Sequence, residues 1–542
     1  MVQEITGPVP AAPARPPRAA ASRSPLLVRL PAAVLGGVAL FLAFPPLDWW
    51  WFAPAGGALI LLSVYGARPR RAFWIGYVAA LGFLLPTLAW VQPIGYDGWL
   101  ALVGVEALFY AAWAAFASLA LRLPWWPLWT AALWVAMEWG RGNLPSLGFP
   151  WARVAFSQGE SPFTPLAALG GAPLVSFATV LCGTLLACAA LRLLPALRDR
   201  LTRDRLRAPL AAPGRTAKAA PLVLALLVPL AGFAVPEPGD EGRTVNVGIV
   251  QGNVPGRGIY AFGDEPAIVL RNHANQTKLL AAAVREGRLP KPDLVVLPEN
   301  STDIDPYRNE FARSVIDESV KDVGVPTLVG AVVSIGDEHR ATRSLVWDPV
   351  TGPGAYYDKQ QLVPFGEYTP FKDVFLALFE RARLVGRQSV PGDKPGDLRM
   401  GPVTIGAVNC YEVAFDETVR ETVRAGGTPL VVQTNNATWA MTDLPAQQLA
   451  MSKLRAVEHN RAVVTAATTG ISAYVTPEGR VSWQTREQVA DMTVATVPVR
   501  TATTLATTVG AAPEWALMLA GAAAVGIALW RGRRRTTDEV TD

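Results

Sequence analysis

Three polar clusters in this sequence each follow a short run of β-branched residues. Glu299 follows the run 294–297, and Cys410 follows the run 403–408. Lys359 lies in a third cluster that is rich in aromatic residues and prolines. In α/β sheets, chemistry collects just beyond the carboxyl ends of strands. An acid, a cation and a thiol placed in this way have the composition of a nucleophilic cysteine site.

Each cluster also has a plain structural interpretation. Taken alone, Glu299 would be interpreted as a solvent-exposed acidic residue in a turn. The segment 357–370 suits a structured surface loop as well as a rigid, partly dry setting for Lys359 and Glu367. A free cysteine such as Cys410 is usually a buried packing residue. Against that reading, its polar neighbours Asn409 and Glu412 indicate that the strand is leaving the core.

A cysteine nucleophile needs a nearby base or cation to form its thiolate. Histidine usually supplies this help, but His273, His339 and His459 all lie outside the strand-end clusters. A Glu299, Lys359 and Cys410 site is therefore favoured over a Cys–His pair. A lysine in such a place can hold a thiolate and stabilise an oxyanion. The cysteine spacings suggest neither a metal site nor a disulfide, and we expect no cofactor.

The composition indicates that part of the chain lies in lipid. Of its 542 residues, 51% are hydrophobic and only 17% are charged, whereas soluble proteins carry roughly a quarter charged residues. The long apolar runs lie before about residue 235 and near the C-terminus. Between them lies a segment of roughly 250 residues, long enough for its own core. No basic and aromatic stripe favours nucleic acid as a partner.

A spanning helix needs roughly 20 apolar residues. The first candidate resembles a secretory signal, but a long polar and Pro/Ala-rich segment precedes it and no clear cleavage site follows, so we treat it as retained. Eight candidate spans are predicted at about 26–44, 50–66, 72–91, 99–121, 124–138, 171–193, 219–236 and 513–530.

Arginine placement sets the expected topology, because cytoplasmic loops carry an excess of basic residues. With eight spans, every basic cluster falls on one side, and both chain ends lie in the cytoplasm. The large domain before the last span then lies outside it. The basic residues concerned are Arg15, Arg18, Arg23, Arg68, Arg70, Arg71, Arg122, Arg198, Arg200, Arg203, Arg205, Arg207, Arg215, Lys218, Arg531, Arg533, Arg534 and Arg535.

The large domain alternates short strand-like runs with helical periodicity, which is typical of an α/β fold. Strands are predicted at 245–250, 294–297, 327–333, 344–347, 403–408, 430–433 and 463–467, with helices at 265–286, 309–323, 416–424 and 446–461. The expected organisation is a disordered cytoplasmic tail at 1–25, a seven-helix membrane domain at 26–236, a catalytic domain at 243–500, a last helix at 513–530 and a tail at 531–542.

These motifs resemble a known family. Leu-Pro-Glu299, Tyr-Asp-Lys359 and Asn-Cys410-Tyr-Glu412 are similar to the Glu-Lys-Cys triad of the nitrilase superfamily. The sequence motif around Glu367, Leu-Val-Pro-Phe-Gly-Glu-Tyr-Thr-Pro, resembles that of apolipoprotein N-acyltransferases. Further matches are Gln251-Gly-Asn253, Glu138-Trp139-x-Arg141, Gly148-Phe-Pro-Trp151 and Arg455-Ala-Val-Glu458-x-x-Arg461.

The resemblance implies an α-β-β-α sandwich and a ping-pong reaction. Glu299 would accept the Cys410 proton, and the thiolate would take an acyl chain from a phospholipid as a thioester. The amino group of a diacylglyceryl-cysteine on a lipoprotein would then receive it. Lys359 would stabilise the oxyanion and Glu367 would orient Lys359 or the amine. The remaining substrate-binding or supporting candidates are Tyr411, Glu412, Trp151, Trp439 and Tyr260, which stands where the family often has a tryptophan.

The expected setting is a bacterial cytoplasmic membrane, with a monomeric enzyme whose catalytic domain faces outward. A membrane-tethered amidase would share the triad, although seven spans would be excessive for a tether. A transporter or scaffold would place ionisable residues along a path in the membrane. Apart from Glu106, the spans carry almost none away from their ends, so this alternative ranks last.

Overall fold

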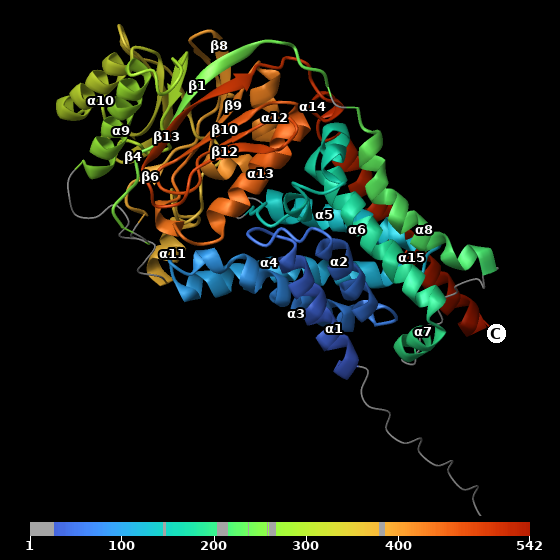
Figure 1. Cartoon of the computed structure of the whole chain (residues 1–542). Coiled ribbons are helices and arrows are strands. Elements are labelled where there is room, and N and C mark those ends of the chain that lie inside the picture. The colour runs from blue at the N-terminus through green and yellow to red at the C-terminus, as the bar shows by residue number, and fades with distance from the viewer. Residues whose placement is uncertain are drawn as a thin grey trace, which may run out of the picture.

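The computed structural model describes residues 26–144, 148–202, 215–236, 238–256, 258, 267–378 and 385–541. The candidate residue Tyr260 lies outside these ranges. A helical bundle forms one half of the molecule, and a domain built on β-sheets forms the other (Figure 1). The last helix returns to the bundle after the sheets are complete, as the hydropathy pattern predicts.

Each of the eight predicted spans coincides with a helix. Close packing joins α3 to α4, α1 to α2 and α3, and α6 to α2, α5 and α8. The helices concerned are α1 (Leu26–Leu42), α2 (Phe52–Val64), α3 (Pro69–Thr87), α4 (Tyr96–Ala120), α5 (Trp126–Asn143), α6 (Ala167–Leu193), α8 (Arg215–Leu230) and α15 (Ala512–Thr541), with the short α7 (Pro195–Thr202) between α6 and α8.

Three helical segments of the described chain are both long and apolar enough to cross a membrane. They are Tyr96–Ala120, Thr164–Leu193 and Ala512–Arg533. Val28–Leu42, Phe52–Val64 and Lys218–Ala234 are apolar but shorter. The count of eight spans therefore stays a prediction, although the arrangement of apolar helices is typical of a membrane protein.

Two β-sheets pack face to face in the other half. Among the described residues, the first has the order β13-β1-β2-β3-β4-β5 with β6 beside β4, and the second the order β12-β11-β10-β9-β8-β7. Their strands are β1 (Thr244–Gln251), β2 (Leu294–Val296), β3 (Thr327–Ile335), β4 (His339–Asp348), β5 (Gly352–Asp358), β6 (Gln388–Ser389), β7 (Asp397–Met400), β8 (Val403–Asn409), β9 (Leu430–Thr434), β10 (Val463–Ala467), β11 (Ala473–Val475), β12 (Val481–Gln484) and β13 (Asp491–Pro498).

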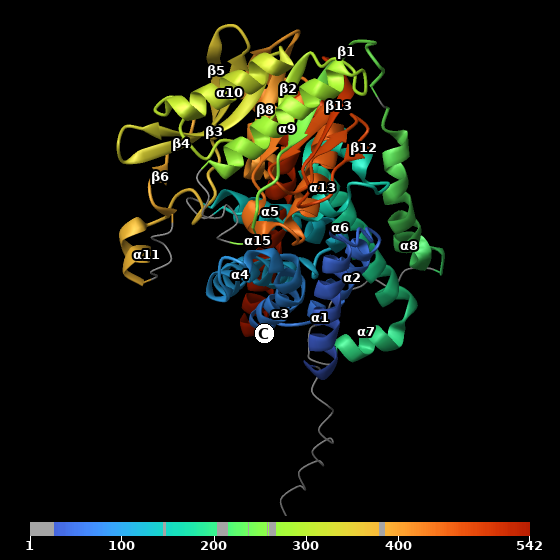
Figure 2. The ribbon, with the colours of Figure 1, turned by 60° about the vertical axis from the view of Figure 1, so that its left-hand side comes forward.

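Helices cover the outer face of each sheet, which gives the expected α-β-β-α sandwich (Figure 2). Helices α9 (Ile268–Arg285) and α10 (Glu310–Val323) pack on the first sheet. Helices α12 (Asp416–Arg424) and α13 (Leu444–His459) pack on the second. Buried aliphatic side chains from both sheets fill the space between them, including Val247, Leu294, Ile405 and Val431.

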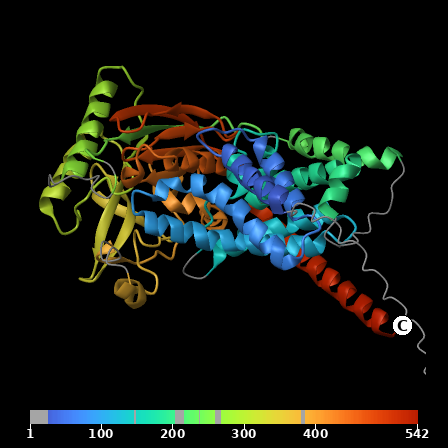
Figure 3. The ribbon, with the colours of Figure 1, turned by 90° about the horizontal axis from the view of Figure 1, so that it is seen from below.

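The sandwich and the helical bundle share one hydrophobic core. Apolar residues of α12, α13 and the second sheet belong to the same buried cluster as those of the bundle. Helix α13 packs directly against α6, and α15 packs against α5. Seen from below, α15 extends beyond the other helices of the bundle (Figure 3). The second sheet, which carries Cys410 at the end of β8, is therefore the layer nearest the membrane helices.

Glu106, the ionisable residue in the middle of α4, has a buried partner. Its Oε2 lies 2.6 Å from Arg141 Nε of α5, and both side chains are almost fully buried. Arg141 also donates to the backbone oxygen of Trp151. The pair thus ties two helices of the bundle to the loop between α5 and α6.

Replacing Glu106 by Ala should lower stability by about 3–5 kcal/mol, because a buried Arg141 would lose its counter-charge. Thermal unfolding of the full chain in detergent measures this. The matched control is Val105→Ala, because Val105 on the same helix is half exposed. Equal unfolding temperatures for the two variants would contradict a structural role for the pair.

Candidate active site

Glu299 is placed by a turn that only a glycine in the neighbouring strand permits. It follows β2, and Asn300 after it has a φ of 53°. A Cβ at Gly330 of β3 would lie 2.1 Å from the Pro298 carbonyl oxygen and 2.7 Å from Glu299 Cα. Such contacts are far too short for any side chain, so Gly330 lets β3 pass close against the backbone of Pro298 and Glu299.

Cys410 lies at the sharp exit from β8. Its φ of 49° is a left-handed conformation that non-glycine residues rarely adopt, at a cost of about 1–3 kcal/mol. The turn after it, Cys410–Ala414, is held by a reciprocal pair of hydrogen bonds between Asn409 and Glu412. In this pair the Asn409 N–H donates to Glu412 Oε2 over 2.6 Å. The strained turn presents the thiol at the end of the strand.

Lys359 follows β5 and lies between two carboxylates. Its Nζ is 2.9 Å from Glu299 Oε1 and 3.0 Å from Glu367 Oε2. Glu367 is fixed in turn, because it accepts hydrogen bonds from Thr342 Oγ1 at 2.9 Å and from the Val363 N–H at 2.8 Å. The strand-end residues singled out from the sequence therefore meet in one buried cluster.

Burial and charge set the protonation of this cluster. Burial, reinforced by Glu299, raises the pKa of the Cys410 thiol to about 12, while Lys359 opposes the rise. Burial also raises the pKa of Glu299, and the Lys359 ammonium works against it. For Lys359, burial opposes the charge, but Glu299 and Glu367 raise the pKa well above its ordinary value. At rest the site holds a protonated thiol beside a charged lysine, so the thiol needs a base in order to ionise.

Glu412 joins the loop of Lys359 to the turn of Cys410. Its Oε1 accepts from Tyr357 Oη at 2.8 Å, from the Gln360 N–H at 2.6 Å and from the Gln361 N–H at 3.1 Å. Burial raises the pKa of this carboxyl to about 7, although its backbone hydrogen bonds oppose the rise. Glu412 thus acts on the site by holding two loops together.

Thr434 and Asn435 contact the cluster although no catalytic role was predicted for them. The Asn435 N–H donates to Glu299 Oε2 at 3.0 Å, and the Thr434 hydroxyl lies 3.2 Å from Cys410 Sγ. Both follow or end β9, which pairs in parallel with β8. The signal was present in the sequence, because the run 430–433 is followed by polar residues in the same way as the runs before Glu299 and Cys410.

Tyr411 lies among aromatic side chains from the loop between α5 and α6. Its ring stacks on Trp151 with centroids 6.2 Å apart and on Phe149 at the same distance. Its hydroxyl donates to the Gly148 carbonyl oxygen at 3.1 Å. Trp439 lies farther along, with its ring centroid 6.1 Å from that of Trp90. The membrane-side loops thus supply part of the wall beside the thiol.

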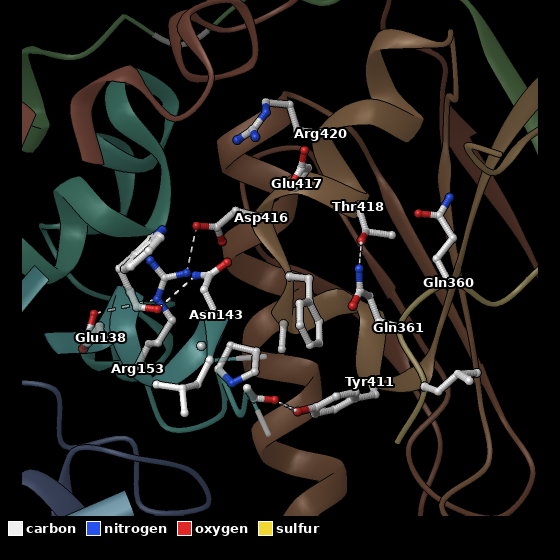
Figure 4. A pocket seen from close by; sticks show the side chains of 18 of the residues that line it. Glu138, Asn143, Arg153, Gln360, Gln361, Tyr411, Asp416, Glu417, Thr418 and Arg420 are labelled. Carbon is white, nitrogen blue, oxygen red and sulfur yellow. Dashed lines mark hydrogen bonds and ion pairs between the residues drawn. The ribbon is translucent and has the colours of Figure 1, made fainter. Parts of the chain in front are cut away.

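A cavity of about 700 Å³ lies on the bundle side of Tyr411 (Figure 4). It is lined from α5, from the loop after Lys359 and from the beginnings of α12 and α15. In its wall, Arg153 Nη1 lies 2.8 Å from Asp416 Oδ2. None of Cys410, Glu299 and Lys359 is among the described residues of its lining. The cavity therefore adjoins the cluster through Tyr411, the residue after Cys410, which is part of the lining.

Two family models match this chain. Residues 36–185 match the apolipoprotein N-acyltransferase N-terminal domain, and residues 266–507 match the carbon-nitrogen hydrolase domain. An apolipoprotein N-acyltransferase of Mycolicibacterium smegmatis is 39% identical over 517 residues, which cover 93% of this chain and 86% of that protein. The chain belongs to the apolipoprotein N-acyltransferase family. A second member, from Geobacter metallireducens, is 30% identical over 84% of this chain and 86% of its own length.

Membership in the apolipoprotein N-acyltransferase family agrees with both halves of the structure. The first matched segment covers α2 to α5 and most of α6, and the second covers most of the sandwich. The chain is therefore an N-acyltransferase with a nitrilase-like domain on a bundle of apolar helices. The resemblance first drawn from the motifs around Glu299, Lys359 and Cys410 is confirmed at the level of the family.

Replacing Glu412 by Gln should weaken the site, because the amide NH₂ would face a hydrogen-bond donor wherever it points. One buried donor without an acceptor costs about 1–3 kcal/mol. We expect a lower unfolding temperature together with slower acyl transfer. The control is Glu318→Gln on the exposed surface of α10. Wild-type activity and stability in Glu412→Gln would show that its hydrogen bonds do not organise the loops.

Proposed function

We propose that this protein transfers an acyl chain from a phospholipid, through a thioester on Cys410, to a lipoprotein. The acceptor is the α-amino group of the N-terminal diacylglyceryl-cysteine. The observation that carries the proposal is the buried cluster in which the Lys359 ammonium bridges Glu299 and Glu367, with the Cys410 thiol nearby. A thioester keeps the acyl group activated while one lipid leaves and another enters.

In the first half-reaction Glu299 removes the thiol proton as Cys410 Sγ attacks the ester carbonyl carbon. The new C–S bond gives a tetrahedral intermediate whose oxyanion is stabilised by Lys359 and by backbone N–H groups near Tyr411. The C–O bond to the glycerol then breaks. The departing alkoxide takes the proton from Glu299, so a lysophospholipid leaves and the acyl-enzyme remains.

In the second half-reaction the neutral amine of the lipoprotein attacks the thioester carbon. Glu299 takes a proton from the attacking nitrogen, and the same groups stabilise the oxyanion. The C–S bond breaks, and the thiolate recovers the proton from Glu299. Glu367 orients Lys359 through their 3.0 Å contact in both halves. The products are an N-acylated lipoprotein and the free enzyme.

Both substrates hold their acyl chains in a bilayer, which fixes where the catalytic domain must lie. Eight spans with both ends in the cytoplasm place residues 243–500 outside the bacterial cytoplasmic membrane, following the distribution of arginines. Segments 1–25 and 531–542 are then cytoplasmic tails, and 26–236 and 513–530 form the membrane part. The shared core of bundle and sandwich supports this assignment, because it keeps the site close to the helices.

The aromatic side chains are assigned to substrate contact. Tyr411 and Trp151 form a stacked wall beside the thiol, and Trp439 extends it toward the bundle. Flat apolar surfaces of this kind suit acyl chains and lipid backbones. Tyr260 is assigned to the same surface on the sequence resemblance alone. We propose that the enzyme acts as a monomer and without a metal or cofactor.

Full-length protein supplied with phospholipid and a diacylated lipopeptide should yield the N-acyl lipopeptide. Lys359→Met should lower its rate of formation by about a hundredfold to a thousandfold, because the oxyanion loses a preorganised charge. The product is measured by mass spectrometry. Lys278→Met, which changes an exposed lysine, is the control.

Two results would oppose the proposal. Release of free fatty acid without any N-acyl peptide would favour a membrane-tethered amidase instead. A folded Lys359→Met enzyme of normal rate would remove this lysine from the mechanism. Thermal unfolding of the variant separates lost chemistry from lost structure.

A further inference from the structure

The hydroxyl behind the Cys410 sulfur has two acceptors and one proton. Thr434 Oγ1 lies 3.2 Å from Cys410 Sγ and 2.9 Å from Gln448 Oε1. A threonine hydroxyl can donate only one hydrogen bond. When the proton goes to Gln448, the hydroxyl has no proton left to donate to the sulfur. The state of the sulfur therefore depends on what Gln448 offers to Thr434.

The oxygen of the Gln448 side-chain amide has hydrogen-bond partners, whereas its nitrogen has none among the described residues. Its side chain is 2% exposed, on helix α13. Its Oε1 accepts from Asn436 Nδ2 at 3.0 Å as well as from Thr434. Within the part of the chain that the structure describes, its Nε2 is buried and has no hydrogen-bond partner. A buried donor without an acceptor costs about 1–3 kcal/mol. This cost favours a rotation of the amide that gives Nε2 a partner.

We propose that the Gln448 amide is a positioning group that decides whether the Thr434 hydroxyl donates its proton to the Cys410 sulfur. With Oε1 toward Thr434, the hydroxyl proton goes to Gln448, and the hydroxyl accepts from a protonated thiol. With Nε2 toward Thr434, the amide donates, and the hydroxyl proton turns to the sulfur. This relay of Gln448 and Thr434 rests on the proposed role of Cys410 as nucleophile.

The second orientation suits the reacting enzyme. A thiolate is an acceptor only, and a hydrogen bond to the charged form of a group favours that form. The relay would therefore stabilise the sulfur when Glu299 takes its proton and again when the thioester breaks. No proton leaves the relay, because the amide and the hydroxyl only turn. The turn gives Gln448 Nε2 the acceptor that it lacks at rest, and Asn436 Nδ2 gives up its contact with Gln448 Oε1.

The turn of the Gln448 amide also involves Asn436. Asn436 must turn its own amide so that Oδ1 faces Gln448 Nε2. A Cβ at Gly470 would lie 2.5 Å from Asn436 Oδ1, so the glycine lets the Asn436 amide pack closely against the backbone there. The two ends of an amide have nearly the same shape, and the exchange needs no backbone shift.

The charged groups that face the sulfur lie on other elements. Glu299 after β2, Lys359 after β5 and Glu367 in the following loop all act on the thiol, and Glu412 lies on its own turn. Thr434, Asn436 and Gln448 do not titrate in the working range. A change in the relay should therefore move the ionisation of Cys410 through hydrogen bonding, with Glu299 and Lys359 left in place.

The test is the pH dependence of Cys410 alkylation by iodoacetamide in the full-length protein in detergent. Peptide mass spectrometry follows Cys410 separately from Cys182 and Cys188, which serve as internal references. Gln448→Glu, which as a carboxylate only accepts, should hold the Thr434 proton and raise the inflection by about one pH unit, or about tenfold in rate at a fixed pH below it. Gln448→Met removes the acceptor and should speed alkylation severalfold.

Threonine variants show whether the effect passes through the hydroxyl. Thr434→Val should slow the alkylation of Cys410, whereas Thr434→Ser should keep the wild-type rate. In the Thr434→Val background, Gln448→Met should have no further effect. Shifts of the same sign in Gln448→Glu and Gln448→Met, or an undiminished Gln448→Met effect in Thr434→Val, would overturn the relay. Thermal unfolding confirms that each variant compared is folded.

The acyl-transfer rate distinguishes this inference from the proposed function. If the relay holds but Cys410 is not the nucleophile, alkylation shifts while N-acyl lipopeptide formation does not follow. If Cys410 is the nucleophile but the relay is wrong, the acyl-enzyme forms with the same pH dependence in all folded variants.

Discussion

The Lys359 ammonium, buried between Glu299 and Glu367, is the interaction on which the rest of the site depends. A buried charge is tolerated only when it is paired and hydrogen-bonded. The pairing holds together the ends of β2 and β5 and the loop that follows β5. The positive charge of Lys359 also opposes the rise that burial causes in the pKa of Glu299. The contacts of Lys359 with Glu299 and Glu367 therefore serve both the fold of the site and the proposed reaction.

A second set of buried charges couples this site to the helical bundle. Arg455 of α13 donates to the carbonyl oxygens of Val413 and Ala414, which belong to the Cys410 turn. Arg455 also forms an ion pair with Asp416 Oδ1. The other oxygen, Asp416 Oδ2, forms an ion pair with Arg153 from the loop between α5 and α6. The position of the Cys410 turn is thus set partly by groups outside the sandwich. A lipid-modifying enzyme gains from this coupling, because its substrates arrive from the bilayer.

Local patterns predicted the site better than they predicted its surroundings. β-branched runs placed Glu299 and Cys410 at strand ends, because a buried central strand has a strong pattern. Strand β12 was missed because only alternate residues are partly buried, and β5 because it contains two glycines and a proline. The Arg141 partner of Glu106 and the contact of Thr434 with the thiol depend on packing between distant segments. No window of sequence contains that information.

The most direct measurement is the mass of the peptide that contains Cys410 after the enzyme meets phospholipid without an acceptor. Our account predicts one acyl chain on Cys410, released when a diacylated lipopeptide is added, and no adduct in Cys410→Ala. An enzyme that turns over while this peptide never gains an acyl mass would contradict the thioester mechanism.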